Sequence, residues 1–431
     1  MTNFNPHRPE GIPTRMPAFE KACGEAGIAG YDFYRGAFMS YSGYQSMARV
    51  LKLMNATLRY TWSAEFMAGT WNKHLNTRVS DDHMLFMGLC ALSQGCKAIA
   101  WFMFHDRDCW GDAPVSSHGH ARPSLGVLRD IRKLAIEGIR EWDQLVPQTD
   151  LGIIYDLASH EHTYLGDPSP CDDNAMHVGA PFIADDEAGC ASMEYEGLFR
   201  LVEHTGRQAA VIDPVHCSER LNVKEMPLVL LPGSPVLHPE TFDSLTRYVM
   251  QGGKLIVTGA WPTLNRNGVS IEFLGGSSPI QSKIKTAVGQ GHIWWSPETL
   301  ASEAEHDPEE SIAWLRTIFE TELTAPNARF EPIEPVSYVE WKRNVTMKSE
   351  GGHQPYTQPR NMLSGILHSG ADDNILFLLN HYAEATRGRL TLANAKATSL
   401  ENLLTGETMA LVGGVAEIEI DRKTVLVFRV C

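Results

Sequence analysis

The order in which apolar segments follow one another constrains the fold of this chain more than any other feature. Over residues 1–140, short apolar runs alternate with amphipathic stretches, and the same alternation resumes from 151 to about 322. From 326 onward only short strand-like segments remain, with turn residues between them. Alternating strands and helices are typical of parallel sheets covered by helices, whereas successive strands are typical of an antiparallel sandwich. The sequence therefore predicts an α/β protein that ends in an all-β part.

The first region contains three strand patterns and several helix patterns. We expect strands over 27–34, 56–66 and 96–105, and helices over 17–27, 42–55, 80–95 and 123–142. The segment 96–105 is almost purely apolar, as is typical of a strand that is buried on both faces of a parallel sheet. Ser80 or Asp81 is suited to cap the helix that follows it, because its side-chain oxygen can accept a hydrogen bond from the first turn.

Three domains are predicted, because 431 residues are long for a single domain. Residues 1–145 hold the first set of β/α units, and the segment 145–150 has the composition of a linker. Residues 146–322 predict a doubly wound, flavodoxin-like domain. Its strands are expected over 151–156, 209–213, 226–233 and 254–259, with helices over 194–206 and 239–253. Residues 323–431 predict an antiparallel β-sandwich.

Charge and cysteine usage exclude several function classes. The chain has 37 basic and 52 acidic residues, a net charge of −15, so phosphate backbones and anionic membrane surfaces are not expected partners. No apolar run is long enough to span a bilayer, and residues 1–17 lack the apolar core of a signal peptide. The eight cysteines are scattered and form no CxxC pair, which excludes a zinc knuckle or a redox dithiol and indicates reduced thiols in the cytoplasm. We expect no metal and no cofactor.

Polar and aromatic side chains gather where the first three predicted strands end. In β/α barrels, catalytic groups stand at the carboxyl ends of the strands. The candidates are Tyr31, Asp32 and Tyr34, then Glu65 with Trp71, and then Trp101, His105 and Trp110. Glu65 is a lone carboxylate after the apolar, aromatic segment TWSA, and tryptophan faces can stack on the C–H faces of sugar rings. This combination indicates a carbohydrate site.

These residues carry a resemblance to a known group of enzymes. WSAEFMAGTWN and ALSQGCKAIAWFMFHDRDCWGDAPVSSHG resemble the last two barrel strands of the β-galactosidases of glycoside hydrolase families 35 and 42 and of related exo-β-glucosaminidases. YDFY resembles their sixth strand. The middle region is similar to the glutamine-amidotransferase-like trimerisation domain of family 42, and the β-sandwich completes the match. The resemblance implies that residues 1–145 are the C-terminal part of a (β/α)8 barrel.

The resemblance also implies roles for individual residues. Glu65 matches the nucleophile of these retaining hydrolases, which use two carboxylates, and Tyr34 is a candidate hydrogen-bond donor to it. Trp71 and Trp101 either contact the sugar or pack in the barrel. His105 either contacts a sugar hydroxyl or is a satisfied polar neighbour. The acidic cluster 106–108 with Asp112 lacks the spacing of a calcium loop, so we interpret it as a solvated loop.

The second carboxylate of the reaction is missing from the sequence. In the family the acid/base glutamate follows an asparagine at the end of the fourth barrel strand, and no Asn-Glu pair occurs in residues 1–140. We therefore expect the C-terminal part of a longer or split enzyme that hydrolyses terminal β-galactosides, or alternatively β-glucosaminides, and that is weak or inactive alone. The expected partners are a carbohydrate substrate and either further copies of the chain or an N-terminal barrel segment. The competing hypothesis is a non-catalytic carbohydrate-binding or oligomerisation scaffold.

The middle region could itself be catalytic only if it held an activated cysteine. An amidotransferase needs a nucleophilic cysteine on a sharp strand-to-helix turn, with a supporting histidine. The turn after 226–233 carries no cysteine, and Cys217 has only His216 beside it in the chain. We therefore interpret the middle region as a structural or oligomerising module.

Overall fold

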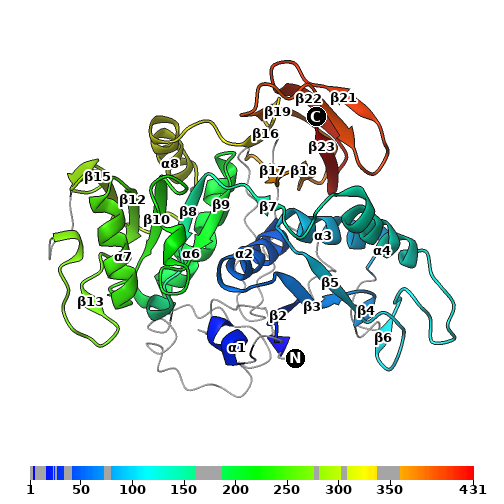
Figure 1. Cartoon of the computed structure of the whole chain (residues 1–431), viewed down its shortest axis with the longest axis horizontal. Coiled ribbons are helices and arrows are strands. Elements are labelled where there is room, and N and C mark those ends of the chain that lie inside the picture. The colour runs from blue at the N-terminus through cyan, green and yellow to red at the C-terminus, as the bar shows by residue number, and fades with distance from the viewer. Residues whose placement is uncertain are drawn as a thin grey trace, which may run out of the picture.

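A computed structural model describes residues 3–4, 16–22, 24, 27–33, 41–71, 79–160, 187–275, 281–301, 308–336 and 360–431. Figure 1 shows three parts: a blue-to-cyan part that holds the N-terminal elements, a green part beside it, and a red part that holds the C-terminus. Among the described helices, none combines the length and the apolar character that crossing a membrane requires.

The first part is built on a parallel sheet of four strands. Its strands are β1 (Asn3–Phe4), β2 (Gly30–Phe33), β3 (Trp62–Met67) and β5 (Ala98–Phe102), in the order β1-β2-β3-β5. Each neighbouring pair is parallel. The helices are α1 (Met16–Ala22), α2 (Tyr41–Thr57), α3 (Asp81–Ser93) and α4 (Ser124–Lys133), and a π-helical turn extends α4 through Leu134–Gly138.

The start of α3 follows the local rule that the sequence indicates. Ser80 is the N-cap residue, and its hydroxyl oxygen accepts a hydrogen bond from the His83 amide at 3.2 Å. Asp81 and Asp82 lie in the first turn, where their negative charge interacts favourably with the helix dipole. Most of the helix is buried, because α3 is covered by α2 on one side and α4 on the other.

The expectation that the strand within 96–105 is buried on both faces is wrong. In β5 four residues are half-buried and Ala100 is exposed. Just beyond the strand, Phe104 keeps 46% of its surface exposed. β5 is the last strand of the four-stranded sheet, so within the described ranges it has a neighbouring strand on one side only. The apolar composition therefore marks a strand that is suited to burial but is only partly covered here.

The middle part is a sheet with helices on both faces. Its strands are β8 (Leu151–Ile154), β9 (Ala209–Ile212), β10 (Leu228–Gly233), β12 (Lys254–Gly259), β15 (Gly291–Ser296) and β14 (Thr286–Val288), in the order β14-β15-β12-β10-β8-β9. β8, β9, β10, β12 and β15 are parallel to one another, and β14 is an antiparallel edge strand. Numbered along the chain, the parallel strands stand in the order 2-1-3-4-5, which is one of the orders of doubly wound sheets.

Alternation along these strands decides which helix covers which face. In β10, Leu228 and Leu230 pack with α6 (Glu187–His204) and α8 (Pro308–Glu322), whereas Val229 and Leu231 pack with α7 (Pro239–Met250). The run is apolar at every position because successive side chains enter different cores. Further short elements complete this part: β11 (Val236–Leu237), β13 (Leu264–Asn265), and the 3-10 turns Ser218–Arg220 and Phe273–Gly275.

The C-terminal part is made of two antiparallel sheets packed as a sandwich. One contains β16 (Ala328–Pro332), β19 (Thr386–Leu392) and β22 (Val415–Ile420); the other contains β21 (Thr408–Ala410), β20 (Ser399–Asn402), β23 (Thr424–Val430), β18 (Asn374–Asn380), β17 (Leu363–Ser369) and β7 (Val146–Pro147). β7 lies in the segment expected to be a linker, 145–150, and it pairs antiparallel with β17. The connection is therefore an edge strand of the sandwich.

One buried carboxylate joins the three parts. Glu203, on α6, is 6% exposed. It accepts hydrogen bonds from the hydroxyl groups of Tyr41 and Tyr44 on α2, at 3.0 and 3.1 Å, and from the amide of Gln45. The hydroxyl of Ser364, on β17, also donates to it. Donors from the first and last parts thus converge on one acceptor of the middle part.

Candidate active site

Glu65 lies at an irregular position of β3. Between two successive pairs with β5, β3 advances by three residues, from Ser63 to Phe66. Over the same stretch β5 advances by only two, so β3 holds one extra residue there. The pairing with β2 shifts at the same point, and Glu65 stands opposite Asp32. A bulge of this kind redirects a side chain, and bulges are frequent next to active sites. The half-buried Glu65 is therefore placed by a local departure from regular pairing.

The neighbours of Glu65 show which face of the sheet it occupies. Phe66 packs on Phe33 of β2 with ring centres 5.9 Å apart, and both belong to the core shared with α2 and α3. Successive side chains in a strand point to opposite faces, so Glu65 and its cross-strand partner Asp32 lie on the face away from these helices. This is the face on which Ala100 is exposed. The chain thus brings two carboxylates together on the face of the sheet that is turned away from α2 and α3.

The environment of Asp32 raises the pKa of its carboxyl group. Asp32 is 5% exposed, and its Oδ1 atom has no hydrogen-bond partner among the described residues. Burial raises the pKa of Asp32 from its usual 3.8 to about 7, and the neighbouring Glu65 carboxylate contributes to the rise. Asp32 is therefore partly protonated at neutral pH. The sequence predicts Asp32 at a strand end and assigns no role to it.

Trp101 lies on the opposite face from Glu65. It stands opposite Phe66 in the pairing of β3 with β5, and its ring meets that of Phe66 edge to face at 5.1 Å. A Cβ atom built on Gly88 of α3 would come within 3.3 Å of the Trp101 ring, so the indole packs against this helix. This placement favours packing, one of the two roles weighed from the sequence, over contact with a sugar.

The other candidate residues are placed less completely. Tyr34 lies outside the described residues. Trp71 belongs to β4 (Thr70–Trp71), whose backbone pairs antiparallel with β6 (Trp110–Gly111), so that Trp71 stands opposite Trp110. This two-stranded sheet joins the segments that follow β3 and β5, beyond the carboxyl ends of both strands. His105 is exposed just after β5 and bridges to Val115.

The acidic cluster after β5 is partly structural. Asp106 forms a two-point ion pair with Arg122, and the Ala113 amide donates to its Oδ1 atom at 2.8 Å. No group of acidic, histidine or cysteine side chains suited to a metal ion occurs in the part of the chain that the structure describes. Asp106 therefore organises the loop that carries β6.

Cys217 and His216 do not form a catalytic pair. The Nδ1 atom of His216 lies 2.8 Å from Oδ2 of Asp213. The Cys217 thiol donates to the backbone carbonyl of Ala56, and burial raises its pKa. A thiol that is protonated at neutral pH is a poor nucleophile, so this site gives the middle part no amidotransferase chemistry.

Comparison with known proteins supports the fold expected from the sequence. Residues 187–289 match the second domain of GLMA-like proteins. No curated protein matches the chain significantly. Among solved structures, the β-galactosidase from Bacillus circulans sp. alkalophilus matches 100% of the chain with a TM-score of 0.65 and 14% identity. A catalytic mutant of a family 42 β-galactosidase from G. stearothermophilus matches 96% with a TM-score of 0.63 and 13% identity. The β-galactosidase from Rahnella sp. R3 matches 95% with a TM-score of 0.59 and 12% identity.

The similarity to family 42 β-galactosidases is therefore confirmed at the level of the fold. The chain covers 63%, 60% and 61% of the lengths of these three relatives. At 12–14% identity these comparisons show a similar fold and do not show a shared activity.

Proposed function

We propose that this chain is the nucleophile-bearing portion of a retaining exo-β-glycosidase of β-galactosidase type, with Glu65 as the nucleophile. The observation that carries the proposal is the position of Glu65. It stands in a bulge of the next-to-last strand of a parallel sheet, on the face turned away from the helices. The fold of the chain is that of family 42 β-galactosidases, as the comparisons with solved structures indicate. The substrate class is terminal β-linked galactosides, with β-glucosaminides as the alternative.

The finer description of the three parts belongs to the same proposal. The four-stranded parallel sheet corresponds to the last strands of a (β/α)8 barrel. The strand order 2-1-3-4-5 supports a flavodoxin-like, amidotransferase-like middle domain. The cysteines Cys90, Cys96, Cys109, Cys217 and Cys431 have free thiols, which supports a cytoplasmic location.

The proposed reaction proceeds in two steps. The Glu65 carboxylate attacks the anomeric carbon, the glycosidic C–O bond breaks, and the leaving oxygen takes a proton from a carboxylic acid. That residue, then a carboxylate, removes a proton from the water that hydrolyses the glycosyl ester. Asp32 is poorly suited to be this acid, because it is 5% exposed and lies directly beside Glu65 on the next strand. The acid must therefore come from a segment that completes the barrel.

The same segment would cover the open sheet. Within the described residues, β1 and β5 are the two edges of the four-stranded sheet, and unpaired strand edges tend to bind further strands. We therefore assign to the chain a partner that supplies the first four β/α units, together with self-association through the middle domain.

The test is to produce the chain with and without the polypeptide encoded directly upstream of it, using 4-nitrophenyl β-galactoside as substrate. Nitrophenolate leaves without a proton, which removes part of the handicap of a missing acid. General acid catalysis contributes about 10²–10⁴-fold, and positioning by the complete barrel is a further requirement. We expect turnover by the pair and none by the isolated chain.

Two Glu→Gln variants distinguish the proposed enzyme from a non-catalytic scaffold. Glu65→Gln should abolish turnover by the pair, whereas Glu137→Gln, which changes an exposed glutamate on the turn after α4, should leave it intact. An inactive pair that still binds galactosides would instead support the non-catalytic scaffold. Equal activity of wild-type and Glu65→Gln pairs would exclude Glu65 as the nucleophile.

A further inference from the structure

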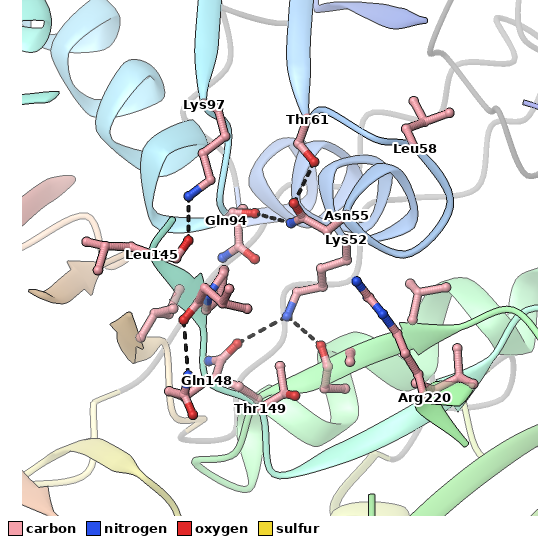
Figure 2. Close-up of a pocket in the computed structure, with 18 of the residues that line it drawn as sticks. Lys52, Asn55, Leu58, Thr61, Gln94, Lys97, Leu145, Gln148, Thr149 and Arg220 are labelled. Atoms are coloured by element: carbon pink, nitrogen blue, oxygen red, sulfur yellow. Dashed lines mark hydrogen bonds between the residues drawn. The ribbon is translucent and has the colours of Figure 1, made fainter. Parts of the chain in front are cut away.

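A cavity of about 620 Å³ lies where the three parts of the molecule meet. We call it the junction pocket; its walls are formed by α2, by the segments that precede β3 and β5, by residues 145–149, by β9 and by Ile366 of β17. Figure 2 shows Lys52 and Asn55 of α2 on one side of it and Gln148 and Thr149 on the other. Because Thr61 and Lys97 precede their strands, the pocket is at the amino ends of β3 and β5, opposite the two-stranded sheet of β4 and β6. Glu65 does not line it.

The walls of the junction pocket are more basic than acidic. Four cationic side chains line it, against two carboxylates, in a chain whose net charge is −15. The cations are Lys52, Arg59, Lys97 and Arg220, and the carboxylates are Asp143 and Glu225. A local excess of positive charge on an acidic protein attracts anions to that place.

Two of the four cations are already engaged by the protein. The Lys97 ammonium donates to the backbone carbonyls of Trp142 and Leu145, and Asp143 lies close enough to influence its pKa. Arg59 pairs with Glu20 at 3.4 Å and donates to the carbonyl of Gly24. These groups close one side of the pocket.

Lys52 and Arg220 are left to face the cavity. The Lys52 ammonium donates to two neutral acceptors, Oε1 of Gln208 at 3.3 Å and the carbonyl of Ala209 at 2.8 Å. Burial lowers the pKa of Lys52 to about 8, although Glu203 and Asp150 partly oppose this. The Arg220 amide donates to the Cys217 carbonyl at 3.1 Å, but its guanidinium forms neither a hydrogen bond nor an ion pair within the described ranges. Figure 2 shows its guanidinium pointing into the pocket, toward Lys52.

We infer that the junction pocket binds a small anionic ligand of about monosaccharide size, whose carboxylate or phosphate group lies between Lys52 and Arg220. An ammonium and a guanidinium that face one cavity can share the oxygens of one anionic group through charge-assisted hydrogen bonds. The volume lies within the range of small-molecule sites, roughly 300–1,000 Å³. Gln148 and Thr149 line the pocket and provide polar groups for the uncharged part of the ligand. This site is separate from Glu65 and does not depend on the proposed glycosidase activity.

The ligand would hold the three parts together. Lys52 belongs to the first part, Arg220 to the middle part, and Ile366 to the C-terminal sandwich, so all three parts contribute to the walls around a bound molecule. A ligand that binds the folded state alone stabilises it in proportion to the logarithm of its concentration over Kd. Binding is therefore expected to raise the thermal midpoint of the whole chain.

Three probes with the same ring test the inference by isothermal titration calorimetry. Galactose 6-phosphate and galacturonate carry the two anionic groups, and galactose carries none. Binding of either anion at least tenfold tighter than that of galactose supports the inference, and the tighter of the two identifies the anionic group. Binding of neither anion, or equal binding of galactose, overturns it.

Variants assign the binding to the pocket. Arg220 is exposed, so Arg220→Gln should fold normally and weaken anion binding about tenfold or more. Arg247→Gln, which changes an exposed arginine on α7 outside the pocket, should bind like the wild type. Lys52→Met is expected to act like Arg220→Gln wherever it folds. If Arg220→Gln binds the anion as tightly as the wild type, the pocket is not the binding site.

Discussion

Asp32 offers a pH-dependent test at the scale of single residues. Its pKa is about 7 in the folded chain, against its usual 3.8. Below pH 4 it is protonated in both the folded and the unfolded states, so it has no effect on stability there. Between pH 4 and 7 only the unfolded state releases the proton, and the folded state becomes progressively less stable, up to a plateau above pH 7.

Asp32→Asn removes this titration. We expect the variant to be more stable than the wild type at pH 8, by about 1–3 kcal/mol after allowance for solvent screening, and to show little gain at pH 4. Urea denaturation at both pH values measures the difference. Asp130→Asn, at an exposed position of α4, is the control and should show no such trend. A gain of the same size at both pH values would contradict the burial of a titrating Asp32.

The sequence predicts some of these residues and not their surroundings. Glu65 is a candidate from the sequence because it is the only acid in β3, after the aromatic segment TWSA, and its role stays a prediction. The face occupied by Trp101 is not recognisable, because β5 is apolar at every position and carries no alternation. The pairing of Asp32 with Glu65 depends on the bulge in β3, and a bulge is a property of two strands together.

At the scale of elements, the close contact between β10 and β12 predicts that a side chain at Gly233 lowers stability. A Cβ atom on Gly233 would lie 2.1 Å from the carbonyl oxygen of Thr258 and 2.5 Å from that of Ala260. Both contacts are with backbone, which cannot turn away as a side chain can. We expect Gly233→Ala to lower the free energy of unfolding by about 2–4 kcal/mol, because the ends of the two central strands must separate.

Gly126→Ala is the matched control for this substitution. Gly126 lies in α4 with nothing within 4 Å of a Cβ atom, so alanine should stabilise the helix by about 0.5–1 kcal/mol. Chemical denaturation of both variants under the same conditions compares them. Similar small effects of the two substitutions would mean that β10 and β12 are not packed as closely as the structure has them.

Most elements follow from their own periodicity, and those that do not are instructive. The strand expected over 254–259 has the bounds of β12, and the last-part strands β17, β18, β19, β22 and β23 lie where turn residues separate apolar runs. The sequence does not predict β14 and β15, because GHIWWS is short and follows a polar region. It predicts a linker at β7, since a two-residue edge strand is defined only by its partner β17.

At the scale of the whole molecule, the sequence predicts three parts but not how they join. One continuous core includes Phe66 and Phe86 of the first part and Phe377 and Leu378 of the sandwich. Both sides of this contact are amphipathic surfaces. Their sequences would have the same pattern of apolar residues if each surface covered a separate core. Which surface meets which is settled by long-range packing, and single-chain periodicity holds no information about it.

The last prediction concerns the carboxylate that joins the parts. Glu203 accepts hydrogen bonds from four side chains of α2 and β17, and its removal would leave these buried donors without an acceptor. Unsatisfied buried donors cost about 1–3 kcal/mol each before relaxation, so we expect Glu203→Ala to lower the free energy of unfolding by about 3–5 kcal/mol. Because the donors come from different parts, unfolding should also split into more than one transition.

Graded variants make this prediction specific to the junction. Ser364→Ala removes one donor of the four and should lower the free energy of unfolding by about 1 kcal/mol, within a single transition. Glu320→Ala changes an exposed glutamate of α8 and should stay within about 0.5 kcal/mol of the wild type. Differential scanning calorimetry of the three variants measures both the stability and the number of transitions. If Glu203→Ala behaves like Glu320→Ala, the three parts are held together by their apolar contacts alone, and the buried carboxylate adds nothing to their cohesion.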